Sequence, residues 1–253
     1  MIKIFGILFL LFLSFNPQKD PNYNKNRKPS AYGINTYVKD NQSSIIKEYE
    51  YLIDSLYDVY IYTENISETS DDGELGQFYI PDYIVITNEE KYIAYEFKEL
   101  SKFKQKTIPY NERTVKAVIF HELTHVYFNQ ILITMKNNNQ YTSPEYGILR
   151  MFPNPATQFG STFIEEGICE YVIYYLNESN PLKDISVPAN ETDLLATENK
   201  INNLYYYSVI FLKDFLNKYG VHKGIEILIG NKPPSYEEIL DPKQFFNRLI
   251  YSN

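Results

Sequence analysis

The chain has 253 residues, 44% of them hydrophobic and 22% charged, so it is long enough to bury the core of one globular domain. Its formal net charge is −8 and no dense cluster of lysine and arginine offsets it. This excludes nucleic acid as an expected partner, because phosphate binding needs a concentrated basic patch. The only cysteine, Cys169, excludes an internal disulfide.

The first thirty residues are expected to lie outside the folded domain. Residues 4–15 form an apolar run after a basic start; its length suits a signal peptide and falls short of the roughly 20 residues of a membrane span. We therefore expect residues 1–15 to be a signal peptide or N-terminal anchor. They are the only membrane tether that the sequence offers, and they predict a secreted, periplasmic or cell-envelope protein. Residues 16–30 predict a flexible linker, and residues 31–253 the folded domain.

The first half of this domain predicts one helix and a small sheet. Apolar residues recur at helical spacing over residues 43–56. Strand-like runs rich in Tyr, Ile and Val follow at residues 59–62, 83–87 and 92–97.

The second half predicts helices. Residues 111–133 are apolar around nearly the whole circumference of a helix, which indicates a buried one. After an irregular stretch at 136–160, Thr162 and Glu165 have the spacing of a capping box that opens a helix to residue 176. Further helices are expected at 203–219, ended by Gly220, and near 223–229, 236–240 and 242–249. A sheet followed by helices predicts an α+β fold.

The buried helix contains the sequence HELTH, with His121, Glu122 and His125. Side chains four residues apart lie on one face of a helix, so both imidazoles can reach one ion. Zinc suits two histidines plus a carboxylate with one open position. Glu122 lies beside the first histidine, where it can take a proton from a zinc-activated water. We therefore predict one Zn²⁺ per chain; scattered polar groups in an apolar helix would cost several kcal/mol unless something satisfied them.

The third ligand must come from elsewhere in the chain. The motif does not continue as H-x-x-G-x-x-H, and the remaining histidine, His222, follows Gly220 and is interpreted as a surface residue. A carboxylate from another helix remains, and the best candidates lie in TFIEEGICEYVIYYL, residues 162–176.

HELTH followed by EEGICEY resembles the gluzincin metallopeptidases, and the resemblance implies a zincin-like metallopeptidase domain. It places the third zinc ligand on Glu166, with Glu165 as runner-up, and implies that Glu170 hydrogen-bonds His121. Cys169 stands where the family has a small residue, which implies a packing role and no metal ligation. Gly167 is expected to let this helix approach the HELTH helix closely.

The resemblance covers roughly residues 111–220. YYYSVIFLKDFLNKYG, residues 205–220, resembles a helix of aminopeptidase-like gluzincins, which implies that Tyr205 donates a hydrogen bond to the oxyanion. Ser208 replaces the usual glycine, so Tyr206 and Tyr207 stay as alternatives. Residues 136–160 are expected to be an insertion near the cleft. No counterpart of G-x-M-E-N is present, which favours an endopeptidase over an exopeptidase.

The expected function is therefore zinc-dependent hydrolysis of a peptide or protein substrate. The main alternative is a catalytically inactive zincin-fold binding protein of the cell envelope. A zinc hydrolase that does not act on peptides is a third hypothesis.

Overall fold

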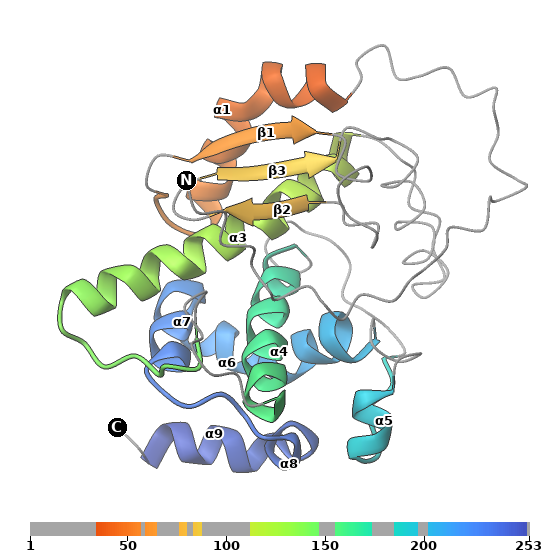
Figure 1. Cartoon of the computed structure of the whole chain (residues 1–253), viewed down its shortest axis with the longest axis vertical. Helices are drawn as coiled ribbons and strands as arrows, with labels where there is room; N and C mark the ends of the chain where they lie inside the picture. Colours follow the sequence, from red (N-terminus) through yellow and green to blue (C-terminus); the bar gives the residue numbers. More distant parts are fainter. Residues whose placement is uncertain are drawn as a thin grey trace, which may run out of the picture. The chain divides into compact units, whose positions relative to one another are not determined.

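The computed structural model describes residues 34–56, 59–64, 76–79, 83–87, 112–146, 155–173, 185–196 and 202–251 (Figure 1). The expected signal peptide, the expected linker and the strand expected at 92–97 lie outside the described residues. The elements in chain order are α1 (Ile34–Leu52), β1 (Tyr60–Glu64), β2 (Gly76–Tyr79), β3 (Tyr83–Thr87), α3 (Glu112–Asn137), α4 (Pro155–Tyr171), α5 (Glu191–Leu195), the π-helix η5 (Asn202–Tyr207), α6 (Ser208–Tyr219), α7 (Val221–Ile229), α8 (Tyr236–Leu240) and α9 (Pro242–Tyr251).

The chain divides into two compact units. Unit 1 takes its described residues from 1–49 and 58–123, and unit 2 takes them from 50–57 and 124–253. Both α1 and α3 contribute to both units, and the division passes through the continuous helix α3 between Leu123 and Thr124. Among the described residues, no helix combines the length and the apolar character needed to cross a membrane.

Unit 1 contains a three-stranded mixed sheet with β3 at its centre. β1 pairs with β3 in parallel and β2 pairs with β3 antiparallel. The sequence of β3, YIVIT, consists of residues that pack well on a pleated surface. In β1, Tyr60 and Tyr62 are half exposed while Ile61 between them is buried, which is the two-residue period of a strand with one covered face.

The same unit packs α1 against the N-terminal half of α3. The rings of Tyr49 and Phe120 meet edge to face with centroids 5.4 Å apart. Nearby, Lys116 Nζ donates to Glu48 Oε1 at 2.6 Å. Both rings are fully buried, so this contact fixes the part of α3 that leads into the histidine motif.

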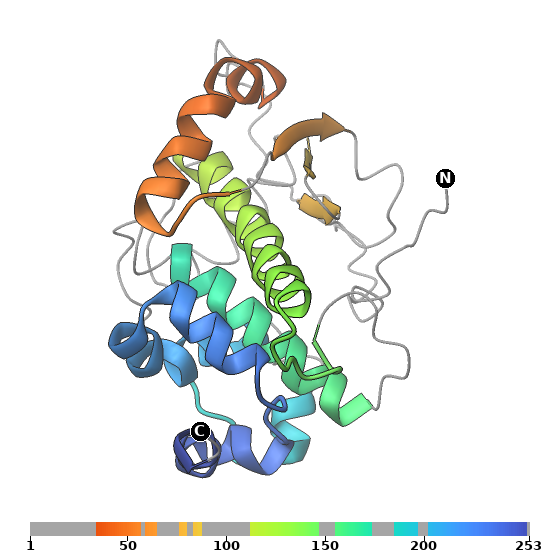
Figure 2. The same cartoon turned by 90° about the vertical axis from the view of Figure 1, so that its left-hand side faces the viewer.

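Unit 2 is built around α4, which packs against η5 and α6 (Figures 1 and 2). Phe163 of α4 contacts Phe211 at a centroid distance of 5.2 Å and Tyr207 at 5.8 Å. Phe211 in turn lies 5.5 Å from Phe245 of α9. Each such aromatic pair contributes about 0.5–1.5 kcal/mol beyond the area it buries. This aromatic cluster holds α4, and with it the side chains of the candidate site, in place.

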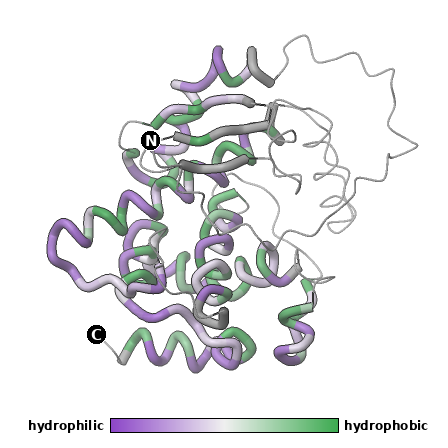
Figure 3. The backbone as a smooth tube through the Cα atoms, in the orientation of Figure 1, coloured by the Kyte–Doolittle hydropathy of each residue, from purple (hydrophilic) through white to green (hydrophobic). Residues whose placement is uncertain are grey.

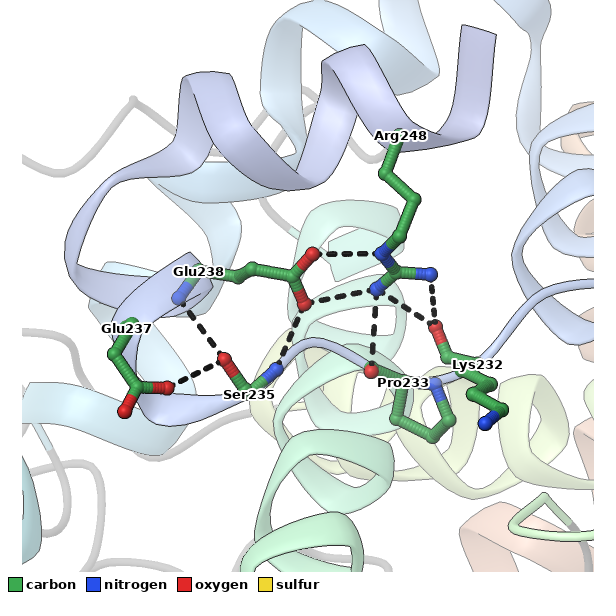
Figure 4. A network of polar contacts seen from close by, with 6 residues as sticks. All are labelled: Lys232, Pro233, Ser235, Glu237, Glu238 and Arg248. Atoms are coloured by element: carbon green, nitrogen blue, oxygen red, sulfur yellow. Dashed lines mark hydrogen bonds and ion pairs between the residues drawn. The ribbon is translucent and has the colours of Figure 1, made fainter. Parts of the chain in front are cut away.

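Helices α8 and α9 close the chain over this core. Arg248 holds Glu238 with two hydrogen bonds, Nε to Oε1 at 2.6 Å and Nη2 to Oε2 at 2.8 Å, and also donates to the carbonyls of Lys232 and Pro233 (Figure 4). Ser235 forms a capping box with Glu238 at the start of α8. Burial raises the pKa of Glu238, but the hydrogen bonds from Arg248 and from the Ser235 backbone outweigh it and leave that pKa lowered. Along α9, polar and apolar stretches alternate in the colouring of Figure 3, and Phe245 and Leu249 are its buried residues.

The predicted α+β class is wrong for the described residues, which are mostly helical. The strands that do form are three short segments of four or five residues. Two helices begin earlier than their sequence patterns indicated: α1 begins at Ile34 where residue 43 was expected, and α4 begins at Pro155 where residue 163 was expected. Both also end earlier, at Leu52 and Tyr171 where residues 56 and 176 were expected. Tertiary packing can extend a helix beyond the residues whose apolar spacing predicts it.

Candidate metal centre

The histidine motif lies in the middle of α3, in a stretch that is buried all round, as predicted. Glu122 and His125 are buried with their apolar neighbours, and His121 is half-buried. Because α3 is one continuous helix, His121 and His125 stand one turn apart on the same side of it. A charged or polar group in such a place needs a partner within the protein or an ion.

Helix α4 carries four further donor side chains. Glu165, Glu166, Cys169 and Glu170 are all buried, and the cysteine is fully so. Positions 165 and 169, and positions 166 and 169, have the spacings that place side chains on one face of a helix. Three carboxylates and a thiol inside the protein form a donor set that suits a metal cation.

Two of these carboxylates face His125 from opposite sides of its ring. Glu165 Oε1 lies 2.8 Å from Nδ1, and Glu166 Oε1 lies 3.8 Å from Nε2. All three side chains are at most 5% exposed. An ionised carboxylate only accepts hydrogen bonds, so with an ionised Glu165 the donor in this pair is Nδ1 of His125. In the neutral ring this leaves the lone pair on Nε2, which is turned toward Glu166.

The spacing between Nε2 and Glu166 suits a shared ion. At 3.8 Å the two atoms are too far apart for a hydrogen bond. Two ligand atoms on one tetrahedral zinc lie about 3.4 Å apart, given zinc–ligand bonds of about 2.0–2.1 Å. A carboxylate that holds the outer nitrogen of a ligating histidine is also the usual second partner in such sites. His125, Glu165 and Glu166 therefore fit a zinc centre.

A third donor atom joins the two histidines. Among the described residues, the ligand atoms of His121, His125 and Cys169 form one group, all within 4.8 Å of one another. The structure thus brings the two predicted histidine ligands together. The predicted ligand Glu166 lies near His125 but is not a member of this group. The structure also places Cys169, for which only packing was expected, among the donor atoms.

The role first assigned to Glu165 is wrong. Thr162 and Glu165 were expected to cap the start of a helix, but α4 begins at Pro155, a residue suited to a first helical position, and both residues lie inside the helix. An interior glutamate cannot cap, and the side chain turns to His125 instead. The missed signal is the pair of acids at 165 and 166 on a helix that is otherwise apolar around them, since buried acids need partners.

The close approach expected of Gly167 occurs with α6. A Cβ atom at Gly167 would lie 2.8 Å from Ser208 Cβ and 2.9 Å from Leu212 Cδ1. The contact between α4 and α6 therefore requires glycine at this position. The close helix approach predicted for Gly167 is present, but with α6 and not with the HELTH helix.

Three tyrosines were candidates for the oxyanion donor. They lie in the π-helix η5, where a single α-helix from 203 to 219 was expected. Tyr207 donates its hydroxyl to the carbonyl of Ile239 at 2.7 Å, and Tyr206 is fully buried. Tyr205 is half-buried, so among the three it keeps the most accessible side chain. Glu170 is buried one turn beyond Glu166, and its expected hydrogen bond to His121 stays a prediction.

His222 lies at the surface, as expected. Its side chain is 47% exposed, its Nδ1 lies 2.6 Å from the hydroxyl of Tyr127, and it approaches Asp54 and Glu226 at 3.4 and 3.6 Å. Burial and the neighbouring Asp54 raise the pKa of Tyr127, so this hydroxyl stays protonated. His222 therefore takes part in a surface polar cluster.

Comparisons of the chain with protein-family models, with curated proteins and with solved structures find no match. The resemblance to gluzincins rests on the residues of α3, α4 and residues 205–220 alone.

Proposed function

We propose that the protein is a zinc-dependent peptidase with one zinc per chain, held by His121, His125 and Glu166. The observation that carries this proposal is the position of His125, buried between Glu165 at one ring nitrogen and Glu166 at the other. A histidine oriented in this way presents a lone pair to a second carboxylate across a gap of the size that zinc fills.

The residues of the chain divide the chemistry among them. Bound zinc supplies Lewis acidity that makes water a nucleophile at neutral pH. Glu122, next to His121 and 7% exposed, is the base that accepts the proton of the attacking water. Tyr205 donates a hydrogen bond to the carbonyl oxygen of the substrate as negative charge develops on it. Tyr207 is less suited to that task, because its hydroxyl already binds Ile239.

The proposed substrate is a peptide or protein, and the bond that is cleaved lies inside the substrate's own chain, away from its ends. Secretion or attachment to the cell envelope through residues 1–15 belongs to the same proposal. An acidic protein with net charge −8 also suits a role in which nucleic acid is not a partner.

Replacing Glu122 with Gln tests the function. We expect the variant to keep zinc and melting temperature but to lose hydrolysis of a casein or peptide-library substrate by about 100-fold or more, since an amide cannot accept the proton. Glu226→Gln, which changes a glutamate beside the exposed His222, is the matched control and should stay active.

The other outcomes separate the hypotheses. Wild-type protein that binds zinc but cleaves no peptide would indicate the inactive binding protein or a different hydrolase. If protein prepared without chelator contains no zinc, the proposed metal centre is wrong. Near wild-type activity in Glu122→Gln would exclude the general-base role.

A further inference from the structure

The donor atom that the proposed ligand set leaves unused is the thiol of Cys169. We propose that Cys169 is itself a ligand of the metal and binds it as a thiolate together with His121, His125 and Glu166. This rests on the proposed function, because it requires the zinc centre described above.

Position and burial both support ligation. Cys169 Sγ lies within 4.8 Å of a ligand nitrogen of His125, and its side chain is fully buried. On α4 it stands one turn beyond Glu165 and Glu166, the two residues that face His125. The helix thus presents the thiol on the side that already contacts the histidine.

The chemistry of the donor set points the same way. Zinc accepts thiolate, imidazole and carboxylate ligands alike, and a fourth protein ligand gives it the closed tetrahedral shell of a structural site. The thiol proton passes to solvent as the sulfur–metal bond forms, and nothing is oxidised or reduced. Since a catalytic zinc keeps one position open, the form with Cys169 bound is a closed resting form of the enzyme.

Two consequences distinguish this role from simple packing. The thiolate adds to metal affinity, because it is a direct ligand. It also occupies the position that hydrolysis needs, so removing it should raise turnover when metal is saturating. Replacing a cysteine that only fills space would not lower metal affinity and raise turnover together.

Cobalt(II) loaded into the metal-free full-length chain gives the deciding measurement. Cobalt occupies the same nitrogen, oxygen and sulfur sites as zinc. A bound cobalt shows weak visible bands, and a thiolate ligand adds an intense sulfur-to-cobalt band in the near ultraviolet. Because the chain has a single cysteine, such a band in the wild type can come only from Cys169.

We expect both sets of bands in the wild type. Visible bands without the near-ultraviolet band would overturn the ligation of Cys169 and leave the metal centre intact. Failure to bind either cobalt or zinc would overturn the ligation and the proposed function together.

Variants supply a second measurement. Cys169→Ala should lose the near-ultraviolet band, keep the visible bands and bind zinc at least about 100-fold more weakly, since even indirect partners of a metal are worth about 10–100-fold. Ile168→Val, at the adjacent buried position of α4, is the control for lost packing and should keep both sets of bands. Unchanged zinc affinity and hydrolysis in Cys169→Ala would overturn the proposal.

Discussion

At the scale of single residues, the state of His125 is decided by Glu165. The buried contact of 2.8 Å between Nδ1 and Glu165 Oε1 fixes the ring orientation, and an ionised Glu165 selects the tautomer with the proton on Nδ1. In the proposed zinc centre, Glu165 is a positioning residue that acts on the metal through His125. Such partners tune affinity although they never touch the ion.

Glu165→Ala should weaken zinc binding by about 10–100-fold, because His125 loses the acceptor that orients it. Glu165→Gln should lose less, since the amide oxygen can still accept from Nδ1. Competition against a chromophoric chelator measures both dissociation constants.

Glu226→Ala is the matched control for this pair, because it also removes a glutamate beside a histidine, at 3.6 Å from the exposed His222. Its zinc affinity should equal that of the wild type. An unchanged affinity in Glu165→Ala would show that the contact with His125 is incidental to metal binding.

Sequence reasoning reached part of this arrangement. The helical spacing of His121 and His125 needs nothing beyond the sequence, because both lie on one helix. The pairing of His125 with Glu165 joins residues 40 positions apart through the packing of α3 and α4, and no periodicity encodes which of two adjacent acids turns toward the histidine.

At the scale of elements, the contact between α4 and α6 depends on the absence of a side chain at Gly167. The neighbouring atom, Ser208 Cβ, is fixed to the backbone and cannot rotate away. Ser208 also donates to the carbonyl of Leu204, which holds it against its own helix.

Gly167→Ala should destabilise the fold by roughly 1–3 kcal/mol through overpacking, although alanine gains about 1 kcal/mol in helix propensity. Thermal unfolding followed by circular dichroism measures the change. Gly224→Ala is the control: its new Cβ would meet the mobile end of Leu216 at 2.7 Å, so it should be close to neutral.

The double variant Gly167→Ala with Ser208→Gly should recover most of the lost stability, because it moves the small residue to the facing helix. If Gly167→Ala alone is as stable as the wild type, the two helices are free to shift apart and the contact does not constrain α4.

Several elements follow from the sequence alone. β3 and α8 have the predicted bounds, and α6 ends at Gly220, whose φ of +76° favours glycine. Others do not follow: α5 is too short for its periodicity to be noticed, and the capping spacing of Thr162 and Glu165 occurs by chance inside a longer helix. The local sequence predicts a helix end better where a residue such as glycine marks it than where tertiary packing sets it.

At the scale of the whole molecule, stability at alkaline pH is limited by buried tyrosines. Burial and then the charge of Asp241 raise the pKa of Tyr207 from 10.0 to about 12. Between about pH 10 and about pH 12 the unfolded chain loses a proton that the folded chain keeps. The stability that this group contributes is therefore complete below about pH 10 and is lost as the pH rises through about 12.

Tyr207→Phe should be less stable than the wild type by about 1 kcal/mol at neutral pH, because the carbonyl of Ile239 loses its donor. Its free energy of unfolding should then fall less steeply above about pH 10. Denaturant unfolding at a series of pH values measures both effects. The contributions of the other tyrosines cancel in the difference between the unfolding free energies of the variant and the wild type. Tyr51→Phe, at an 89% exposed position, should follow the wild type throughout; parallel curves for Tyr207→Phe would refute the expectation.

The predicted fold class failed at this same scale. Of the expected strands, those at 59–62 and 83–87 correspond to β1 and β3, whereas β2 was not expected. The share of strand in the fold was overestimated, because hydrophobic spacing does not measure how far packed helices extend. The relative position of His121 and His125 needs less information than the architecture, since the two residues lie one turn apart on one helix.

The π-helix η5 has a consequence for the directions of the three tyrosines. Its backbone hydrogen bonds span five residues where those of an α-helix span four, so successive side chains turn through a smaller angle along it than along α6. The directions of Tyr205, Tyr206 and Tyr207 therefore do not follow from the helical period of α6.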